Sequence, residues 1–221
     1  MFSNFKRLGA IFVVLIAATG AIASSATAEV THDFEAESTP YILTGTTSGK
    51  ETAFKFTSGA SVTCGASGLN GTVSSSPTQE LTVQPTYENC TLSSLAATID
   101  TPCNNVFTGA TNAFEHATVH IECPPGNTVQ ITVNGCTILI GGQTPEQGAH
   151  YTNTGSGSSR DVDINVTMKN AAYEKVGVLC GLIAGLGGEL SIVGNYTVKA
   201  YKDVGGAEGS QIGFWTKATI S

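Results

Sequence analysis

Charged residues are scarce in this chain of 221 residues, because Asp, Glu, Lys and Arg together make up only 12% of it. The acidic residues outnumber the basic ones by 17 to 10. Lys6 and Arg7 lie in an N-terminal segment that we expect to be removed, which takes the formal charge from −7 to −9. Nucleic acid and anionic lipid both favour a basic surface. The composition therefore argues against both as partners.

Several motifs that carry chemistry are missing from the sequence. It contains no G-x-S-x-G nucleophile elbow, no phosphate-binding loop and no dinucleotide-binding fingerprint. No two cysteines have the C-x-x-C spacing of zinc and redox sites. Asp161, Asp163 and Asn165 alternate, but the central glycine and terminal glutamate of a calcium-binding EF-hand loop are absent. The sequence thus predicts no catalytic residue and no cofactor, and we expect a non-enzymatic protein.

An apolar run near the N-terminus predicts export. Lys6 and Arg7 precede the run, which covers residues 8–18 and is shorter than the roughly 20 residues that a membrane span needs. Small residues follow, and an A-x-A pattern ending at Ala28 predicts cleavage between Ala28 and Glu29. We therefore interpret residues 1–28 as a signal peptide and 29–221 as a mature chain without a membrane span. Its expected location is extracellular or at the cell surface.

Alternating apolar and polar residues indicate β-strands throughout the mature chain, most clearly between residues 117 and 140. Ala117, Val119, Ile121 and Cys123 share one face of an extended segment, and a similar alternation follows up to Val133. Asn134-Gly135 is a strong hairpin signal. We expect an all-β protein, an antiparallel β-sandwich with either one compact core or two closely packed β-halves. An internal boundary between such halves would lie near residues 93–102.

All six cysteines lie in the mature chain, and an even number in an exported protein indicates three disulfides. Residues facing each other in an antiparallel hairpin have numbers with a constant sum. Cys64 and Cys90 are centred on the predicted turn at Pro77, and Cys103 and Cys123 on a predicted loop near residue 113.

The third disulfide is predicted from the distance between two cysteines that cannot pair. Cys123 and Cys136 would lie at opposite ends of one strand, about 20 Å apart, which is too far for a disulfide. Cys136 then pairs with Cys180, and their centre falls near residue 158 in a Gly/Ser-rich loop. The predicted disulfides are therefore Cys64–Cys90, Cys103–Cys123 and Cys136–Cys180.

The weak candidates for a metal site are His116, His120 and Glu122, which share the polar face of one predicted strand. Residues two apart on a strand lie about 7 Å apart, so a shared metal would need a ligand from a neighbouring strand. Such a pattern more often marks an ordinary polar strand face than a metal site.

Aromatic side chains that form an exposed platform could bind carbohydrate. Aromatic residues scattered along strands, however, more often lie in the core. The aromatic candidates are Tyr151, Tyr173, Tyr196, Tyr201 and Trp215.

The stretch from Val176 to Leu190 is apolar and rich in glycine. Its Gly181-x-x-x-Gly185 motif is found in membrane helix dimers, but the run is too short to span a membrane. We expect a buried turn.

Six motifs follow one another along the mature chain: an alternating strand that ends in Cys64, LTVQPTYENC (Leu81 to Cys90), VHIECPPGNTVQITVNGC (Val119 to Cys136), DV-x-I-x-V (Asp161 to Val166), VLC (Val178 to Cys180) and GFW (Gly213 to Trp215). Their order resembles a group of secreted, cysteine-paired, β-rich proteins of high-GC Gram-positive bacteria that has no assigned activity. The resemblance covers most of the mature chain. It supports export and disulfide formation and implies no functional residues. We therefore expect a secreted, non-enzymatic binding or cell-surface structural β-module with an unknown extracellular or cell-surface ligand. A secreted hydrolase and a metal-dependent binding module are the alternatives.

Overall fold

The computed structural model describes residues 30–47, 52–109, 117–144, 146–183 and 185–220. The regular elements of these ranges are strands and two short 3-10 helices, and no helix among them is long and apolar enough to cross a membrane. The strands are β1 (Val30–Ala36), β2 (Tyr41–Thr47), β3 (Thr52–Phe56), β4 (Ser61–Val73), β5 (Glu80–Leu92), β6 (Leu95–Asp100), β7 (Asn104–Thr108), β8 (Val119–Glu122), β9 (Val129–Val133), β10 (Cys136–Ile140), β11 (Glu146–Thr154), β12 (Asp161–Ala171), β13 (Glu174–Val176), β14 (Leu190–Val204), β15 (Ala207–Ile212) and β16 (Phe214–Ile220), and the 3-10 helices are η1 (Gly157–Ser159) and η2 (Val178–Leu182).

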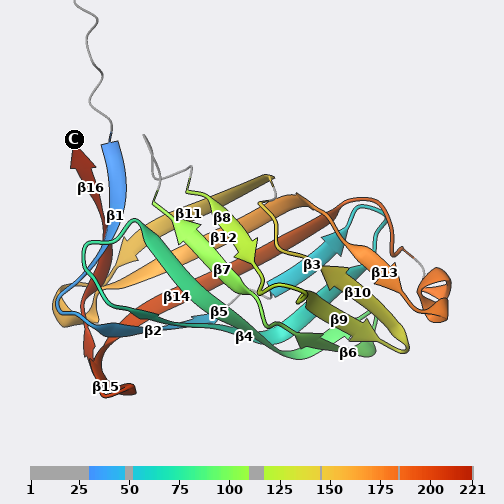
Figure 1. Cartoon of the computed structure of the whole chain (residues 1–221), viewed down its shortest axis with the longest axis horizontal. Coiled ribbons are helices and arrows are strands. Elements are labelled where there is room, and N and C mark those ends of the chain that lie inside the picture. Colours follow the sequence, from blue (N-terminus) through green and yellow to red (C-terminus); the bar gives the residue numbers. More distant parts are fainter. Residues whose placement is uncertain (1–29, 48–51, 110–116, 145, 184, 221) are drawn as a thin grey trace, which may run out of the picture.

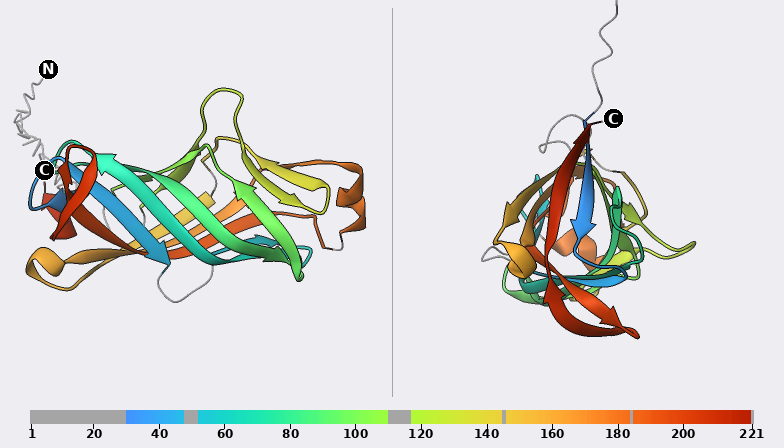
Figure 2. Two further views of the ribbon diagram at one scale, coloured as in Figure 1. Left: turned by 90° about the horizontal axis from the view of Figure 1, so that it is seen from below. Right: turned by 90° about the vertical axis from the view of Figure 1, so that its left-hand side faces the viewer.

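A 14-stranded antiparallel sheet contains every described strand except β1 and β16, which pair with each other. Its main path runs β11-β12-β14-β2-β4-β5-β6-β9-β10-β13, and β3, β7, β8 and β15 join at its sides. The sheet curls so strongly that Ala149 of β11 forms an isolated bridge with Ala117, just before β8 (Figure 2). The structure confirms the all-β antiparallel class, and the two layers of the sandwich are flanks of one hydrogen-bonded sheet.

Three long strands run through the molecule and change partners midway. β14 pairs with β3 through Leu190–Val193 and with β2 through Tyr196–Lys202. β4 also pairs with β3 and then β2, while β5 pairs with β6 and with β7. One half of the molecule therefore contains β3, β6, β9, β10 and β13, and the other contains β2, β7 and β8 (Figure 1). On the other side of β14, β12 pairs with it from Leu190 to Val198 and so lies alongside both halves. A single cluster of buried side chains runs through both halves. Within the range 93–102, β6 pairs with β5 on one side and β9 on the other.

The clearest sequence patterns form the elements that they predict. Val119 and Ile121 are buried on β8, as their alternation requires. Asn134 and Gly135 both have positive φ, at 44° and 78°, and join β9 to β10 in a two-residue hairpin. Positive φ at both central residues is the mark of a type I′ turn, which explains the preference for Asn-Gly at this position.

The structure contains the three disulfides expected from the sequence. Cys64 and Cys90 face each other in the ladder between β4 and β5, with Cα atoms 3.9 Å apart. Cys103 and Cys123 lie one step beyond the ladder between β7 and β8, with Cα atoms 4.2 Å apart. These two pairs follow the hairpin geometry used to predict them.

The third disulfide, Cys136–Cys180, is formed for a different reason. The hairpin centred near residue 158 is β11–β12, in which Thr154 pairs with Asp161. Cys136 instead begins β10, which pairs with β13, and Cys180 lies in η2, which follows β13. The disulfide thus attaches a 3-10 turn to the neighbouring strand and does not join two facing strands.

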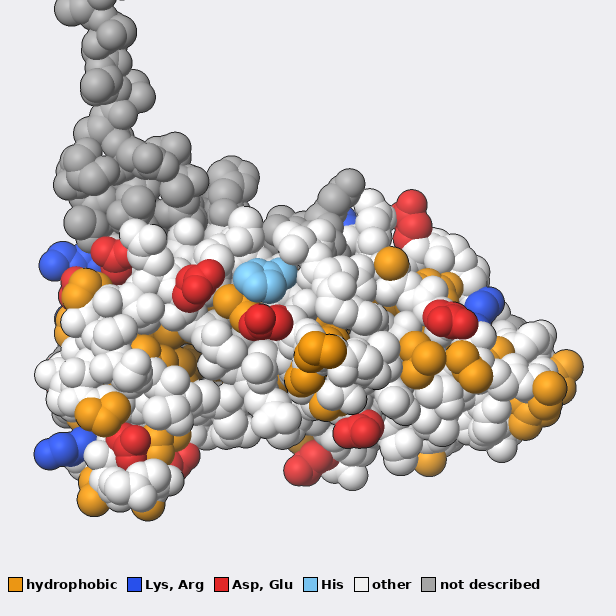
Figure 3. All heavy atoms as spheres, viewed as in Figure 1, with side chains coloured by type: hydrophobic (Ala, Val, Ile, Leu, Met, Phe, Trp, Pro, Cys, Tyr) orange, Lys and Arg blue, Asp and Glu red, His pale blue; other side chains and the backbone are white. Residues whose placement is uncertain are grey.

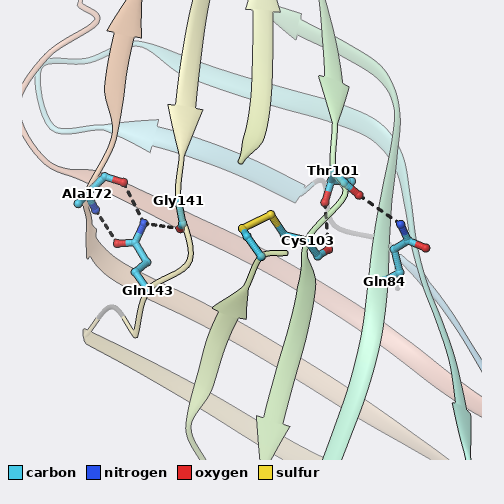
Figure 4. The surroundings of a disulfide bond; sticks show 7 residues. Gln84, Thr101, Cys103, Gly141, Gln143 and Ala172 are labelled. Atoms are coloured by element: carbon cyan, nitrogen blue, oxygen red, sulfur yellow. Dashed lines mark hydrogen bonds between the residues drawn. A yellow bond between two sulfur atoms is a disulfide. The ribbon is translucent and has the colours of Figure 1, made fainter. Parts of the chain in front are cut away.

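Side-chain amides continue the hydrogen bonding where ladders end. The Gln143 amide donates to the Ala172 carbonyl at 2.9 Å and accepts from the Ala172 N–H at 2.7 Å (Figure 4). In the same way, the Asn153 amide of β11 donates to the Thr216 carbonyl of β16 at 2.9 Å and accepts from the Thr216 N–H at 2.8 Å. Backbone groups that a ladder leaves unpaired need such partners when they are shielded from water. Asn153 thereby attaches the β1–β16 pair to the main sheet.

Candidate interaction surface

The candidate metal ligands do not form a cluster in the described part of the chain. His120 is half-buried opposite Val106, and Glu122 is exposed at the end of β8, both on the outer face of the sheet. His116 lies outside the described residues. Among the residues that are described, no three His, Cys, Asp or Glu side chains come together in a way that could hold a metal ion. The structure therefore brings no third described ligand to His120 and Glu122.

The acidic row on β12 is engaged by neighbouring side chains. Gln211 donates to an Asp161 carboxylate oxygen at 2.8 Å, and the Lys199 ammonium lies 3.8 Å from the other oxygen. Thr197 donates to Asp163 at 2.7 Å. Burial raises the pKa of Asp161, and Lys199 opposes this rise, Asp163 adds to it and Gln211 opposes it. Because Val162 and Ile164 between them are buried, the acidic row lies on the outer face of the sheet.

Most of the aromatic side chains considered for carbohydrate binding are packed against other groups. Tyr151 and Tyr196 are buried. The Arg160 guanidinium lies 4.9 Å above the ring of Trp215, whose indole N–H donates to Glu35 at 3.0 Å. Tyr173 packs edge-on against Phe56, and Tyr201 is half-buried. An aromatic platform for sugars needs an open ring face, which these contacts restrict.

The hydroxyl groups in the middle of the core pair with one another. Thr52 Oγ1 lies 2.5 Å from Ser67 Oγ and 3.4 Å from the Tyr196 hydroxyl. Burial raises the pKa of Tyr196, so the phenol stays protonated at neutral pH. His120 and His150, whose side chains are described, lie on the outer face of the sheet and do not adjoin this cluster. Neither of them can therefore act as a base for these hydroxyls.

The least usual surface is the end of the molecule built by β13 and η2, where apolar side chains are uncovered. Val178 is 92% exposed and Leu182 is 79% exposed. Hydrophobic side chains gather at this end in Figure 3, and it is the end farthest from β1 and β16 in Figure 1. We call this surface the apolar tip, and its residues are Leu95, Val176, Val178, Leu179, Leu182 and Ile183.

A groove of about 260 Å³ crosses the apolar tip. Its floor includes Leu92, which is fully buried, and its rim includes the exposed Leu182. Two hairpin turns border it: Ser93-Ser94 between β5 and β6, and Asn134-Gly135 between β9 and β10. All four turn residues have positive φ. The groove is therefore framed by tight turns of the sheet.

Glycines and a disulfide set the position of η2 against these turns. A Cβ at Gly177, whose φ is +117°, would lie 2.5 Å from the Gly135 carbonyl oxygen, so the two backbones approach as closely as glycine permits. Cys180 is buried and bonded to Cys136. The Leu179 side chain reaches to within 3.1 Å of the Cβ position of Gly135. The fixed backbone leaves Val178 directed into solvent.

The chain after η2 is tied to the opposite flank of the sheet. The Ser58 hydroxyl donates to the carbonyls of Gly185 and Gly187 at 2.5 and 2.7 Å. The Ala60 N–H donates to the Gly185 carbonyl at 3.1 Å, and the Lys175 ammonium donates to the Leu186 carbonyl at 3.0 Å. Leu186 is buried. The segment therefore closes this end of the core while its apolar side chains at η2 remain outside.

The sequence-based expectation of a buried turn is wrong for η2. Cys180 and Leu186 are buried, but Val178 and Leu182 are almost fully exposed. The apolar composition predicted burial. No pattern in the sequence distinguishes the residues of this stretch that face the core from those that face solvent. The available signal was the complete lack of charge from Val176 to Gly188 in a segment that contains five glycines.

No family model, curated protein or solved structure matches this chain. The resemblance to secreted proteins of high-GC Gram-positive bacteria stays a prediction. The argument for function therefore depends on the surface described above.

Proposed function

We propose that this chain is an exported, non-enzymatic binding module that contacts its ligand through the apolar tip. The observation that carries this proposal is a set of uncovered apolar side chains on a backbone that is fixed by a disulfide, at the end remote from β1 and β16. Disulfides persist in oxidising compartments, so the three bridges fit an exported protein.

Grouped exposure of large apolar side chains distinguishes the apolar tip from an ordinary surface. Single exposed apolar residues are common on folded proteins, whereas contiguous groups mark contact sites. Val176 and Leu95 are 47% and 44% exposed and add to Val178 and Leu182. Fully burying one such side chain contributes about 1.5–3 kcal/mol. A ligand that covers Val178 and Leu182 would therefore bind about ten to a hundred times more tightly for each side chain that it fully buries.

Because the backbone of the apolar tip is already ordered, binding a ligand there loses little conformational entropy. A loop that must become ordered on binding loses conformational entropy, and this loss reduces affinity. Here Cys136–Cys180, the Ser58 hydrogen bonds and the close approach of Gly177 to Gly135 hold the segment before any ligand is present. The binding energy of the exposed side chains is then available for contact with the ligand.

Retention of the purified mature protein on cell-envelope fragments tests this proposal. The informative variant is Val178→Asp/Leu182→Asp, because both side chains are exposed and their replacement leaves the core intact. Val204→Asp is the matched control, since Val204 is 60% exposed and lies at the opposite end beside β15. Each protein carries the same fluorescent label, and the bound fraction is measured by sedimentation.

The proposal predicts that the double variant loses at least tenfold in retention, while Val204→Asp binds like the parent. Equal retention of the parent and the double variant would show that the apolar tip is not the contact surface. Hydrolysis of envelope material by the parent would replace the binding proposal with the hydrolase alternative.

A further inference from the structure

We propose that the apolar tip inserts into the interfacial region of a lipid layer that carries no net charge. This inference depends on the proposed function, because it names the partner of the same surface. Three observations support it: the area of the apolar tip, the charges around it and the position of its exposed side chains.

The exposed area is small for a protein partner. Leu95, Val176, Val178 and Leu182 together expose on the order of 400 Å², against roughly 800 Å² per partner in a stable protein interface. A second copy docked tip to tip would therefore bury too little area for a lasting dimer. A lipid layer needs no complementary shape and covers whatever apolar area enters it.

The charges also favour a neutral lipid layer. The stretch from Val176 to Gly188 contains no charged residue, so insertion removes no ionised group from water within it. Glu174 and Lys175 precede this stretch on β13, and both are exposed. The pair carries no net charge and places ionised groups next to the apolar tip, where headgroups would lie. Without a basic cluster, binding to anionic lipid has no electrostatic advantage.

The two most exposed side chains of the apolar tip determine how strongly it would bind to lipid. Val178 and Leu182 are the two most exposed large apolar residues described, and both project from η2 at the end of the molecule. Transfer of two such side chains strengthens binding by roughly 10²- to 10⁴-fold. That range is comparable to the marginal, reversible membrane binding of a single acyl chain. The inference is thus of reversible attachment.

Vesicles of pure phosphatidylcholine provide the probe, with tryptophan fluorescence as the reporter. The chain has one tryptophan, Trp215, at the end remote from the apolar tip. Leu182→Trp places a second indole at the apolar tip, where the native side chain is 79% exposed. Vesicles containing brominated phosphatidylcholine quench only indoles that enter the lipid. The parent, Val178→Asp/Leu182→Asp and Val204→Asp are measured in parallel with Leu182→Trp.

The inference predicts that Leu182→Trp is quenched, that Trp215 in the parent is not, and that the double variant loses at least tenfold in vesicle binding. Raising the salt concentration should leave the binding of the parent to pure phosphatidylcholine unchanged. Adding phosphatidylglycerol should weaken that binding, because the chain carries a net negative charge, and stronger binding to the anionic vesicles would overturn the choice of a neutral layer. Quenching of Trp215, or vesicle binding that survives in the double variant, would overturn it.

Three further outcomes distinguish a failure of this inference from a failure of the proposed function. Absence of vesicle binding, combined with envelope retention that depends on the apolar tip, would make the partner an envelope component other than a neutral lipid layer and overturn the lipid inference alone. Self-association of the parent in sedimentation velocity, lost in the double variant, would identify a second copy as the partner. Loss of both vesicle binding and envelope retention would overturn both proposals.

Discussion

The two ends of the molecule differ in how they expose apolar side chains: Val204 is exposed singly near the β1–β16 end, whereas those of the apolar tip are exposed as a group. At the end formed by β1 and β16, Phe34 and Phe214 are fully buried, and polar groups cover the aromatic surface outside them. Arg160 lies over Trp215, and Glu35 accepts from the indole while lying 3.3 Å from the Lys217 ammonium. At the apolar tip the backbone is equally well bonded, but no charged side chain covers Val178 or Leu182 within the described residues.

This difference shows that exposure at the apolar tip does not come from poor local order. The segment is bonded to both flanks of the sheet, through Cys136 on one side and Ser58 on the other. An apolar side chain that needed burial could have been placed inward, as Leu186 is. The arrangement is therefore typical of a contact surface, and the following changes test the contrast between the two ends.

The largest effect is expected from removing the disulfide at the apolar tip. Cys136→Ala/Cys180→Ala should lose about 2–4 kcal/mol of unfolding free energy, because the unfolded chain becomes less constrained. Cys103→Ala/Cys123→Ala should lose a similar amount and serves as the control. Only the first variant should show faster proteolysis within residues 177–189, measured by mass spectrometry of the fragments. Equal proteolysis there in both variants would contradict the role given to Cys136–Cys180.

A loss of comparable size is expected at Gly177. Gly177→Ala places a Cβ 2.5 Å from the Gly135 carbonyl oxygen at a φ of +117°, and we expect a loss of about 3 kcal/mol in chemical denaturation. Gly206→Ala is the matched change at the other end, with a φ of +89° and no heavy atom within 4 Å of the new Cβ. It should lose only about 1–2 kcal/mol, from its backbone conformation alone. Equal losses would show that the close approach at the apolar tip is unimportant.

A weaker effect is expected from uncovering the aromatic surface at the β1–β16 end. Arg160→Ala removes the cation from the face of Trp215 and should lose about 0.5–1 kcal/mol. The fluorescence of Trp215 should shift, because the ring becomes more exposed to water. Arg160→Lys should retain part of both properties. An unchanged emission spectrum in Arg160→Ala would mean that the guanidinium does not cover the ring in solution.

The smallest effect concerns Asp161, whose pKa in the folded protein is raised above its ordinary value, chiefly by burial. A raised carboxyl pKa means that the ionised form is disfavoured in the folded state, so stability is lost as the pH rises through the carboxyl range. Asp161→Asn removes this loss. Its melting temperature relative to the parent should therefore increase from pH 3 to pH 7, by an amount equivalent to a few tenths of a kcal/mol. A decrease over the same range would contradict the direction of the shift.

Local pattern predicted much of the fold because short-range geometry decides it. The alternation of Val119 and Ile121 fixes which face of β8 is buried, and Asn134-Gly135 fixes a two-residue turn. The register of β4 and β5 follows from the turn at Pro77, and it places Cys64 opposite Cys90. Each of these results needs only neighbouring strands.

Features that depend on distant strands could not be predicted in the same way. Cys136 and Cys180 pair because β10 lies beside β13, and nothing near residue 158 determines that order. The exposure of Val178 depends on whether another layer covers η2, which hydropathy alone does not reveal. The candidate surface was missed for this reason, since apolar composition predicts burial wherever the partner layer is unknown.

Methyl spectra of the labelled protein, recorded with and without envelope fragments, test the central claim most directly. The methyl groups of Val178, Leu182 and Val204 report the two ends of the molecule in one experiment. The account predicts that the Val178 and Leu182 signals shift or broaden on binding, while the Val204 signals stay unchanged. Changes confined to Val204, or binding with no change at Val178 and Leu182, would contradict the claim that this protein makes contact through its apolar tip.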